Sequence, residues 1–190
     1  MKKVLVIDNY DSFTYNLVHY LENFDCEVTV FRNDEFDLEE IQPFEYIVLS
    51  PGPGIPEQAG LLNSVIKEFA ASKKILGICL GQQAIAEVFG GNLINLENVF
   101  HGVATSISIV DKEELLFKNL KSKIDVGRYH SWVVNETNLP SELVITAVDE
   151  NHQIMALRHQ TFNVRGVQFH PESILTPTGK TILSNWLEFY

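Results

Sequence analysis

Short apolar runs alternate with segments of helical periodicity along the first half of the chain. An unbroken apolar run between polar residues is typical of a strand buried on both faces of a parallel sheet. Such runs predict strands at residues 4–7, 46–49 and 75–78, and a further strand is predicted at 26–31. Between and after them, helices are predicted at 12–24, 36–41, 60–71 and 80–89, where apolar residues recur at every third or fourth position.

This alternation of strand and helix favours an α/β fold. We expect an open, mainly parallel twisted sheet with helices on both faces, of flavodoxin-like type. In the second half, strands predicted at 104–110, 125–134, 143–148, 154–157 and 164–169 follow one another across short polar connections, before a helix at 178–189. Consecutive strands of this kind predict antiparallel or mixed additions to the sheet. Without a repeat, low-complexity tract or linker, residues 1–190 are predicted to form one domain.

The net charge of the chain argues against some classes of binding partner. The chain carries 14 basic and 25 acidic residues, a formal net charge of −11, which argues against a nucleic-acid or anionic-membrane surface. No segment approaches the roughly 20 apolar residues of a membrane-spanning helix, and the first apolar run is too short for a signal peptide. The two cysteines form neither a C-x-x-C pair nor a disulfide framework, so a reducing, cytoplasmic location is expected.

One cysteine lies in a frame that suits a nucleophile. A G-x-C-x-G sequence at residues 77–81 joins the strand predicted at 75–78 to the helix predicted at 80–89. On such a sharp turn the neighbours two positions away must be small, because the backbone doubles back on itself. The turn also places Cys79 at the N-terminus of a helix, where the helix dipole favours thiolate over thiol. The alternative is a buried core cysteine, the role expected for Cys26.

A thiol nucleophile needs a general base and a group that orients the base. His170 directly follows the strand predicted at 164–169 and should lie at the same sheet edge as Cys79. Pro171 keeps the next step extended, so Glu172 can accept the Nδ1 hydrogen of His170 and fix the tautomer that faces the sulfur. We therefore predict a Cys79–His170–Glu172 catalytic triad. The alternative for His170 and Glu172 is a solvated ion pair at a strand end.

Attack on a carbonyl also requires backbone N–H donors for the developing negative charge. Leu80, directly after the nucleophile, offers one such donor. Gly52 offers the other, in the Pro- and Gly-rich loop at 50–56 that follows the strand predicted at 46–49. A plain tight turn is the alternative for this loop. A Walker-type phosphate loop is excluded, because no Gly-Lys-Ser/Thr follows.

Other polar residues give weaker signals. Asp8 and Asp11 resemble the acidic pocket of a receiver domain, but Ser50 stands where the phosphoacceptor aspartate would follow the third predicted strand. Residues 9–12 are instead expected to cap the first helix and to line an edge for a partner. His130 is expected to be packed or to contact a partner, and no ligand spacing predicts a metal site. Three further histidines are expected at the surface: His19, His152 and His159.

Five stretches, in order and spanning nearly the whole chain, carry a family resemblance. They are DNYDSFTYNL at 8–17, LSPGPG at 49–54, GICLGQQ at 77–83, RYHS at 128–131 and HPESILT at 170–176. The chain resembles the class I, triad-type glutamine amidotransferases. Within them it is most similar to the glutaminase component, component II, of anthranilate synthase and aminodeoxychorismate synthase. The nucleophile and HPE motifs are specific to the class, and the first and last stretches are specific to the chorismate-linked branch.

The resemblance implies a reaction and a site for it. Cys79 would attack the side-chain amide of L-glutamine, His170 would protonate the departing ammonia, and water would release glutamate from a thioester. Gly52 and Leu80 would supply the oxyanion donors. The residues that would hold the α-amino and α-carboxylate groups of glutamine are Gly52, Pro53, Gly54, Gln83, Ser131 and Trp132.

The resemblance also implies a partner. Ammonia would pass to a separate chain, a chorismate-utilising synthase (component I), since no part of a chain of 190 residues looks large enough for the second activity. The product would be anthranilate for tryptophan synthesis, 4-amino-4-deoxychorismate for folate synthesis, or both. This chain would need no cofactor, whereas the partner synthase of this family uses Mg²⁺.

Three positions depart from the family pattern. Gln82 replaces the usual His, Trp132 stands where Leu often follows His-Ser, and Val103 replaces the usual Lys after His101. The first two should adjust the shape of the pocket without removing the chemistry. The third removes the basis for assigning the His101 loop a role in signalling to the partner. Two alternatives stay open: a stand-alone γ-glutamyl hydrolase of the same fold, and a non-catalytic, flavodoxin-like binding module.

Overall fold

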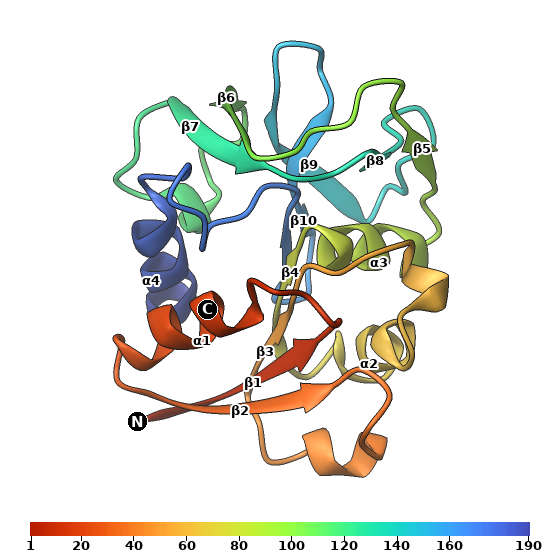
Figure 1. Cartoon of the computed structure of the whole chain (residues 1–190), viewed down its shortest axis with the longest axis vertical. Coiled ribbons are helices and arrows are strands. Elements are labelled where there is room, and N and C mark those ends of the chain that lie inside the picture. Colours follow the sequence, from red (N-terminus) through yellow and green to blue (C-terminus); the bar gives the residue numbers. More distant parts are fainter.

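The strands form one nine-stranded sheet and a separate two-stranded sheet (Figure 1). The computed structural model describes residues 1–190. In the order of the large sheet, the strands are β2 (Cys26–Arg32), β1 (Lys2–Asp8), β3 (Tyr46–Leu49), β4 (Lys74–Ile78), β11 (Val164–Val167), β10 (Ile154–His159), β9 (Leu143–Val148), β6 (Val103–Ile109) and β7 (Lys123–Arg128). The small sheet pairs β5 (Leu93–Asn95) with β8 (Trp132–Val134).

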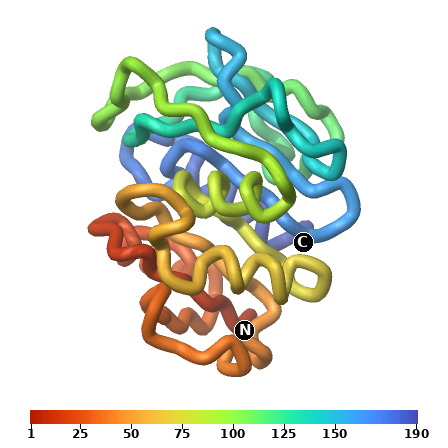
Figure 2. The backbone as a smooth tube through the Cα atoms, turned by 90° about the vertical axis from the view of Figure 1, so that its right-hand side faces the viewer, coloured from red at the N-terminus to blue at the C-terminus, as the bar shows by residue number.

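Neighbouring strands are parallel from β2 to β11 and antiparallel from β11 to β7. Strand β11, from late in the sequence, lies beside β4, so that Val167 pairs with Ile78. Figure 2 shows the red and orange segments at one end of the molecule and the green to cyan segments at the other, with the dark blue C-terminal segment between them. The predicted parallel sheet with antiparallel additions is confirmed.

Helices cover both faces of the parallel strands, as the alternation predicted. Along β1, Val4 and Val6 belong to the core cluster of α1 and α4, whereas Leu5 and Ile7 belong to the cluster of α2 and α3. All four side chains are buried, because side chains alternate across a strand and helices cover each face. The helices are α1 (Thr14–Glu22), α2 (Leu62–Phe69), α3 (Leu80–Val88) and α4 (Gly179–Phe189).

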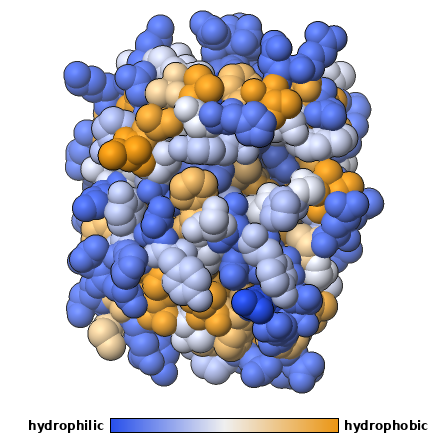
Figure 3. All heavy atoms as spheres, viewed as in Figure 1, coloured by the Kyte–Doolittle hydropathy of each residue, from blue (hydrophilic) through white to orange (hydrophobic).

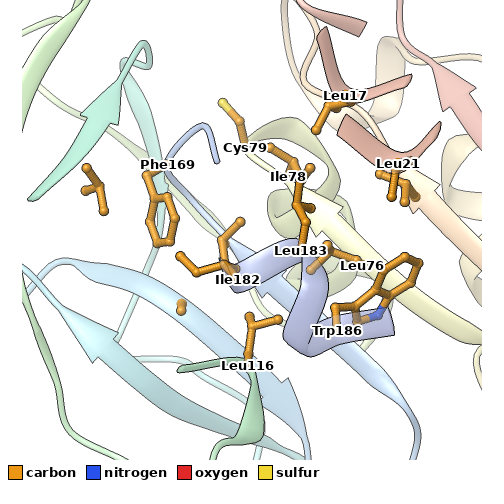
Figure 4. Close-up of a cluster of buried hydrophobic side chains, with 14 of the residues drawn as sticks. Leu17, Leu21, Leu76, Ile78, Cys79, Leu116, Phe169, Ile182, Leu183 and Trp186 are labelled. Atoms are coloured by element: carbon orange, nitrogen blue, oxygen red, sulfur yellow. The ribbon is translucent and has the colours of Figure 1, made fainter. Parts of the chain in front are cut away.

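The cluster beneath α1 and α4 reaches the predicted nucleophile. Figure 4 shows Trp186 and Leu183 of α4 near Leu76 and Ile78 of β4, with Cys79 at the end of the strand and its sulfur directed away from these side chains. The cysteine thus has apolar packing on one side only. The buried cluster fixes the backbone at the point where the strand ends and leaves the thiol at its margin.

Two of the predicted helices differ from the observed elements in their start or their type. The first helix begins at Thr14 with Phe13 as its N-cap, not at residue 11 or 12. The carboxylate of Asp8 accepts the Thr14 hydroxyl, and that of Asp11 accepts the Phe13 N–H, so this segment forms a turn that delays the helix. The helix predicted at 36–41 is the 3₁₀ helix η1 (Leu38–Ile41). Two further 3₁₀ helices were not predicted: η2 (Pro56–Gln58) and η3 (Leu115–Phe117).

The strand predicted at 125–134 is in fact two strands. β7 ends at Arg128 and pairs with β6, whereas β8 begins at Trp132 and pairs with β5. The intervening backbone is held by segment 96–102, whose N–H groups at Phe100 and Leu96 donate to the carbonyls of His130 and Ser131. The break depends on partners distant in sequence, and no Gly or Pro marks it. It positions residues 129–131 as a loop beside the end of β4.

The exterior carries mixed polarity. On the face of Figure 3, hydrophilic side chains dominate and apolar ones gather in separate groups. None of the helices combines the length and the apolar character needed to cross a bilayer.

Candidate active site

The carboxyl ends of four parallel strands meet at one edge of the sheet. The segments that follow β1, β3, β4 and β11 contribute Asn9, the loop at 50–54, Cys79 and the segment 168–172. Because these strands are neighbours and parallel, their ends lie side by side, the usual location of ligand sites in open α/β sheets. As predicted, His170 and Cys79 follow neighbouring strands at the same edge of the sheet.

Cys79 occupies a sharp turn between β4 and α3. Its backbone has φ 52° and ψ −102°, a conformation that residues with a side chain rarely adopt. A Cβ at Gly77 would lie 2.5 Å from the backbone of Gly81, and a Cβ at Gly81 would lie 2.5 Å from the carbonyl oxygen of Leu49. Both positions therefore require glycine, for the steric reason predicted from the G-x-C-x-G frame. The side chain of Cys79 is 6% exposed.

His170 and Glu172 form a buried pair. The Nδ1 of His170 lies 2.6 Å from Oε1 of Glu172, and both residues are almost fully buried. The backbone between them is held in a turn, because the His170 carbonyl accepts from the N–H of Ser173 and from the hydroxyl of Thr176. The alternative of a solvated ion pair does not fit this burial. Glu172 fixes Nδ1 as the donor and leaves Nε2 free to exchange a proton.

The pKa of the His170 imidazole also depends on the neighbouring thiol. Burial lowers the pKa of His170, but the neighbouring Cys79 and Glu172 side chains outweigh burial and raise it from 6.5 to about 10. The ring is therefore protonated at neutral pH. No well-formed hydrogen bond joins Nε2 to the sulfur, and Nε2 is buried without a partner. Rings of Phe13 and Tyr129 flank the imidazole, with centroids at 5.9 Å and 4.8 Å, and restrict its rotation.

The two predicted oxyanion donors lie on either side of the nucleophile's turn. Leu80 is the first residue of α3, so its N–H has no acceptor within the helix. No backbone carbonyl accepts the N–H of Gly52. A Cβ at Gly52 would lie 2.5 Å from Cβ of Asn9 and 2.8 Å from Cδ2 of Leu80, so only glycine lets this loop approach the turn.

A buried asparagine holds the Gly52 loop in place. The side-chain amide of Asn9 donates to the carbonyl of Ser50 at 2.8 Å, and its backbone N–H donates to the Ser50 hydroxyl at 2.9 Å. Asn33 donates to Oδ1 of Asn9 at 3.0 Å. The sequence predicted helix capping for the segment that contains Asn9; the structure instead ties Asn9 to the ends of β2 and β3. Its buried amide donates to one loop and accepts from another, a role that is visible only in the fold.

A small polar hollow of about 150 Å³ opens beside the thiol. It is lined by Gly52, Pro53, Gly54, Cys79, Gln83, Tyr129, His130, Ser131 and Trp132. All six predicted substrate-binding residues are in this lining, whereas the three remaining site residues, His170, Glu172 and Leu80, lie outside it. A larger hollow of about 340 Å³ between β6 and η3 contains neither a cysteine nor a histidine. The small hollow is thus the one that adjoins a nucleophile.

Gln83 and Gln168 form a hydrogen-bonded chain to the thiol. Gln83 Nε2 donates to the Trp132 carbonyl at 2.9 Å and to Oε1 of Gln168 at 3.2 Å. Gln168 Nε2 then lies 3.5 Å from the sulfur of Cys79. Gln168 was not among the site residues predicted from the sequence. No local pattern marks it, because its contact joins two residues that are 89 positions apart in the sequence.

His130 is buried, as expected. Its hydrogen bonds hold the ring in one protonation state. Its Nε2 accepts from Nε of Arg128 at 3.1 Å, and its Nδ1 donates to the Trp132 carbonyl at 3.1 Å. Burial, together with the Arg128 charge, lowers the pKa of His130 from 6.5 to about 3. The ring is neutral and braces the loop that carries Ser131 and Trp132. Nowhere in the chain do three or more His, Cys, Asp or Glu side chains group in a way that could hold a metal ion.

This arrangement can perform acyl transfer. A thiol nucleophile lies on a strained turn at the margin of the polar hollow. Beside that turn are a protonated imidazole oriented by a carboxylate and two backbone N–H groups without an acceptor. An amide carbonyl in the hollow would meet the nucleophile and the N–H donors together. The leaving amine would find a proton on the imidazole.

Comparisons with known proteins agree with this chemistry. The family model described as class-I glutamine amidotransferase matches residues 5–189. The chain is 47% identical over 191 residues to anthranilate synthase component 2 of Pseudomonas aeruginosa, covering 97% of this chain and 94% of that protein. It is 44% identical over 189 residues to aminodeoxychorismate/anthranilate synthase component 2 of Bacillus subtilis, covering 98% of this chain and 96% of that protein.

Solved structures confirm the fold class. A GMP synthase-type protein from Thermoplasma acidophilum has a TM-score of 0.88 and 28% identity, covering 98% of this chain and 92% of that one. The family match extends over nearly the whole sequence, and the relatives from Pseudomonas aeruginosa and Bacillus subtilis are similar over almost their entire lengths. The bifunctional protein TrpGD of Thermotoga maritima, 46% identical over 191 residues, is matched over only 32% of its length. The chain therefore belongs to the class-I glutamine amidotransferase family.

Proposed function

We propose that this chain is the glutaminase component, component II, of a synthase that aminates chorismate. The names of the relatives from Pseudomonas aeruginosa and Bacillus subtilis support this assignment. The observation that carries the chemistry is the strained Cys79 turn beside the buried His170–Glu172 pair. The substrate is L-glutamine, and the products are glutamate and ammonia.

The reaction begins with attack of the Cys79 sulfur on the side-chain carbonyl carbon of glutamine. A sulfur–carbon bond forms, and the N–H groups of Gly52 and Leu80 stabilise the oxyanion. His170 Nε2 gives its proton to the amide nitrogen, the carbon–nitrogen bond breaks, and ammonia leaves a thioester. The neutral imidazole then removes a proton from water, whose oxygen attacks the thioester. The sulfur–carbon bond breaks and leaves the thiolate, the imidazolium and a side-chain carboxylic acid. This acid loses its proton, which the released ammonia can take up, and becomes glutamate.

The hollow supplies groups that suit the α-amino and α-carboxylate ends of glutamine. Gln83 uses its amide N–H groups on Trp132 and Gln168, which leaves its carbonyl oxygen as an acceptor for an α-ammonium group. Ser131 offers a hydroxyl in the same lining, and Trp132 closes one wall. The Gly52–Gly54 loop offers backbone groups on the other side. Its Gly54 has φ 73°, a conformation that suits glycine.

Ammonia is passed to a separate partner chain, a chorismate-utilising synthase (component I). That partner forms anthranilate, 4-amino-4-deoxychorismate or both, and it carries the Mg²⁺ requirement. No cofactor, nucleic acid or membrane takes part on the side of this chain. The cytoplasm is the proposed location, since a reducing compartment keeps the Cys79 thiol reactive.

Substitution of Cys79 by serine tests the proposal. In the reconstituted complex, Cys79→Ser should lower glutamine-dependent synthesis by about 10³-fold or more, since the nucleophile is removed, and should spare synthesis from added ammonia. Product formation from chorismate is measured with each nitrogen source. Cys26→Ser, which changes a buried cysteine outside the site, is the matched control and should retain both activities.

Two outcomes would contradict the assignment. Loss of both activities in Cys79→Ser would mean that this cysteine is structural. Robust glutamyl hydrolysis by the wild-type chain that no synthase changes would favour the stand-alone γ-glutamyl hydrolase, whereas absence of any turnover with a synthase would favour the binding module.

A further inference from the structure

Gln168 is a buried polar residue that the proposed mechanism does not use. It is fully buried one position beyond the end of β11, where its backbone N–H donates to the carbonyl of Met155. Its side-chain Nε2 lies 3.5 Å from the sulfur of Cys79, within the range of an N–H···S hydrogen bond. A buried amide aimed at a nucleophilic atom is not explained by packing alone, since an apolar residue would fill the same space without a polar group to satisfy.

The hydrogen-bond partners of Gln168 determine which end of its side-chain amide faces the sulfur. The backbone carbonyl of Trp132 can only accept, so the group of Gln83 that faces it must be the NH₂. That same NH₂ also faces Gln168, which must therefore present its Oε1 to Gln83. The remaining group, the Gln168 NH₂, is left for the sulfur. A backbone carbonyl thus sets the polarity of the whole chain from Trp132 to Cys79.

We propose that Gln168 is a catalytic residue, which donates a hydrogen bond to the Cys79 sulfur when the sulfur is a thiolate. The inference deepens the proposed glutaminase function and rests on it for the reaction. A hydrogen bond to the charged form of a group favours that form, and burial strengthens the bond. The sulfur is a thiolate before attack on glutamine and again when the thioester carbon–sulfur bond breaks. In the thioester it carries no charge, so the bond is strongest at the two steps that need the anion.

Other groups also act on the thiolate and must be kept constant in a test. His170 approaches the sulfur from the segment after β11, with Glu172 behind it. Tyr129 and His130 line the hollow from the loop between β7 and β8. The substitutions described next change none of these titratable residues.

The test compares two glutamine-to-methionine substitutions. Gln168→Met keeps the length of the side chain and removes the donor. Gln82→Met is the matched control, because Gln82 is equally buried on α3, but its amide makes no hydrogen bond. The full-length chain, without glutamine, is treated with iodoacetamide between pH 5 and pH 10, and alkylation of Cys79 is followed by peptide mass spectrometry.

In Gln168→Met, the alkylation rate at pH 6–7 should fall about tenfold, because fewer sulfurs are ionised when the donor is absent. The rate plateau at high pH should be unchanged or higher, so the pH of half-maximal rate moves upward by about one unit. The Gln82→Met profile should overlay that of the wild type. An unmoved profile in a folded Gln168→Met chain, or an equal shift in Gln82→Met, would overturn the proposal.

If Gln168→Met does not fold, the proposal can be tested on the wild-type chain by NMR. In the ¹⁵N-labelled chain, the side-chain amide signals of Gln168 should move with pH in step with the alkylation profile, and should stop moving once Cys79 is alkylated. Gln168 amide signals that change neither with pH nor on alkylation of Cys79 would overturn the proposal. Because alkylation needs no glutamine, failure of this inference is distinguishable from failure of the glutaminase assignment, which is read from glutamate release.

Discussion

At the scale of single residues, His130 shows how hydrogen bonds set a protonation state. Arg128 has only donors, so the His130 Nε2 that faces it must be an acceptor and cannot carry a proton. The second nitrogen, Nδ1, is committed to the Trp132 carbonyl. Protonation of the ring would break the contact with Arg128 and place two buried cations side by side. The lowered pKa of His130, about 3, follows from burial and from this charge.

The lowered pKa predicts a pH dependence of stability. In the unfolded chain an imidazole binds a proton as the pH falls through 6.5, whereas in the folded chain His130 stays neutral down to about pH 3. Between these two pH values the unfolded state binds more protons than the folded state. The free energy of unfolding therefore decreases as the pH decreases, and His130 contributes roughly 1 kcal/mol of this loss per pH unit. His130→Asn, which keeps a donor for Trp132, should lack this contribution. Urea unfolding of both proteins at pH 7, 6 and 5 measures it.

At pH 7 the variant should be less stable by about 1–3 kcal/mol, because Arg128 loses an acceptor and a cavity forms. The difference between the two proteins should narrow as the pH falls, since only the wild type carries the His130 penalty. A difference that stays constant from pH 7 to pH 5 would mean that His130 titrates normally in the folded chain.

Residue chemistry was predictable from the sequence where it depends on local geometry. The need for glycine at 77 and 81 follows from spacing along the chain, and the structure has the predicted close approach. Glu172 reaches His170 as predicted, but through a turn at 171–172 and not through the extended step that was expected after Pro171. His159 was wrongly expected at the surface. It is buried and stacked on Phe162, and its Nδ1 accepts backbone N–H groups of its own turn. Gln168 was overlooked because its partner, the sulfur, lies far away in sequence.

At the scale of elements, the ends of β1, β2 and β3 are joined by one buried asparagine. Asn9 forms hydrogen bonds with Ser50 and Asn33. It also packs directly against Gly52, where a side chain would collide with it. The oxyanion loop after β3 is therefore placed by the end of the neighbouring strand β1, and not by its own sequence alone. Loop positioning of this kind acts on rate, because a displacement of about 1 Å at a catalytic donor can cost 10²-fold.

We expect Asn9→Ala to lower kcat for glutamine hydrolysis by about 10- to 100-fold in the reconstituted complex, through loss of the Gly52 donor geometry. It should also destabilise the fold by about 1–3 kcal/mol. Asn185→Ala is the matched control, because this buried asparagine likewise donates to two backbone carbonyls, at Leu116 and Lys118, far from the site. Equal effects of the two substitutions on kcat would refute a positioning role for Asn9.

Element prediction succeeded where one segment determines its own state. The apolar run at 46–49 gave β3 with its observed bounds, because a strand buried on both faces needs apolar residues throughout. The bounds of β9 were also predicted, although it contains Thr146 and is only partly buried. The interval 125–134 was misassigned because its break at 129–131 depends on hydrogen bonds from segment 96–102. That loop forms one wall of the hollow, so the sequence described the strands better than the shape of the site.

At the scale of the whole molecule, the residues proposed for catalysis meet at one edge of the sheet, but one hydrogen bond between them does not form with good geometry. The sulfur accepts from Gln168, while His170 Nε2 stays buried and unpaired. Hydrogen bonds of this kind commonly tighten only when substrate or a partner closes the site. An amidotransferase that released ammonia without a synthase would waste glutamine, and a loose resting site avoids that loss.

We therefore expect the isolated chain to be a poor glutaminase that its partner stimulates. Addition of the synthase component should raise kcat for glutamate release by about tenfold or more, corresponding to ~1.4 kcal/mol of transition-state stabilisation. Glutamate release at saturating glutamine is compared with synthase, without it, and with serum albumin at the same concentration. The stimulation should appear in kcat more than in KM, because the missing contact joins Nε2 to the nucleophile and not to the substrate. Equal rates in all three samples would show that the His170–Cys79 contact needs no partner, and the loose geometry would then have to close on glutamine alone.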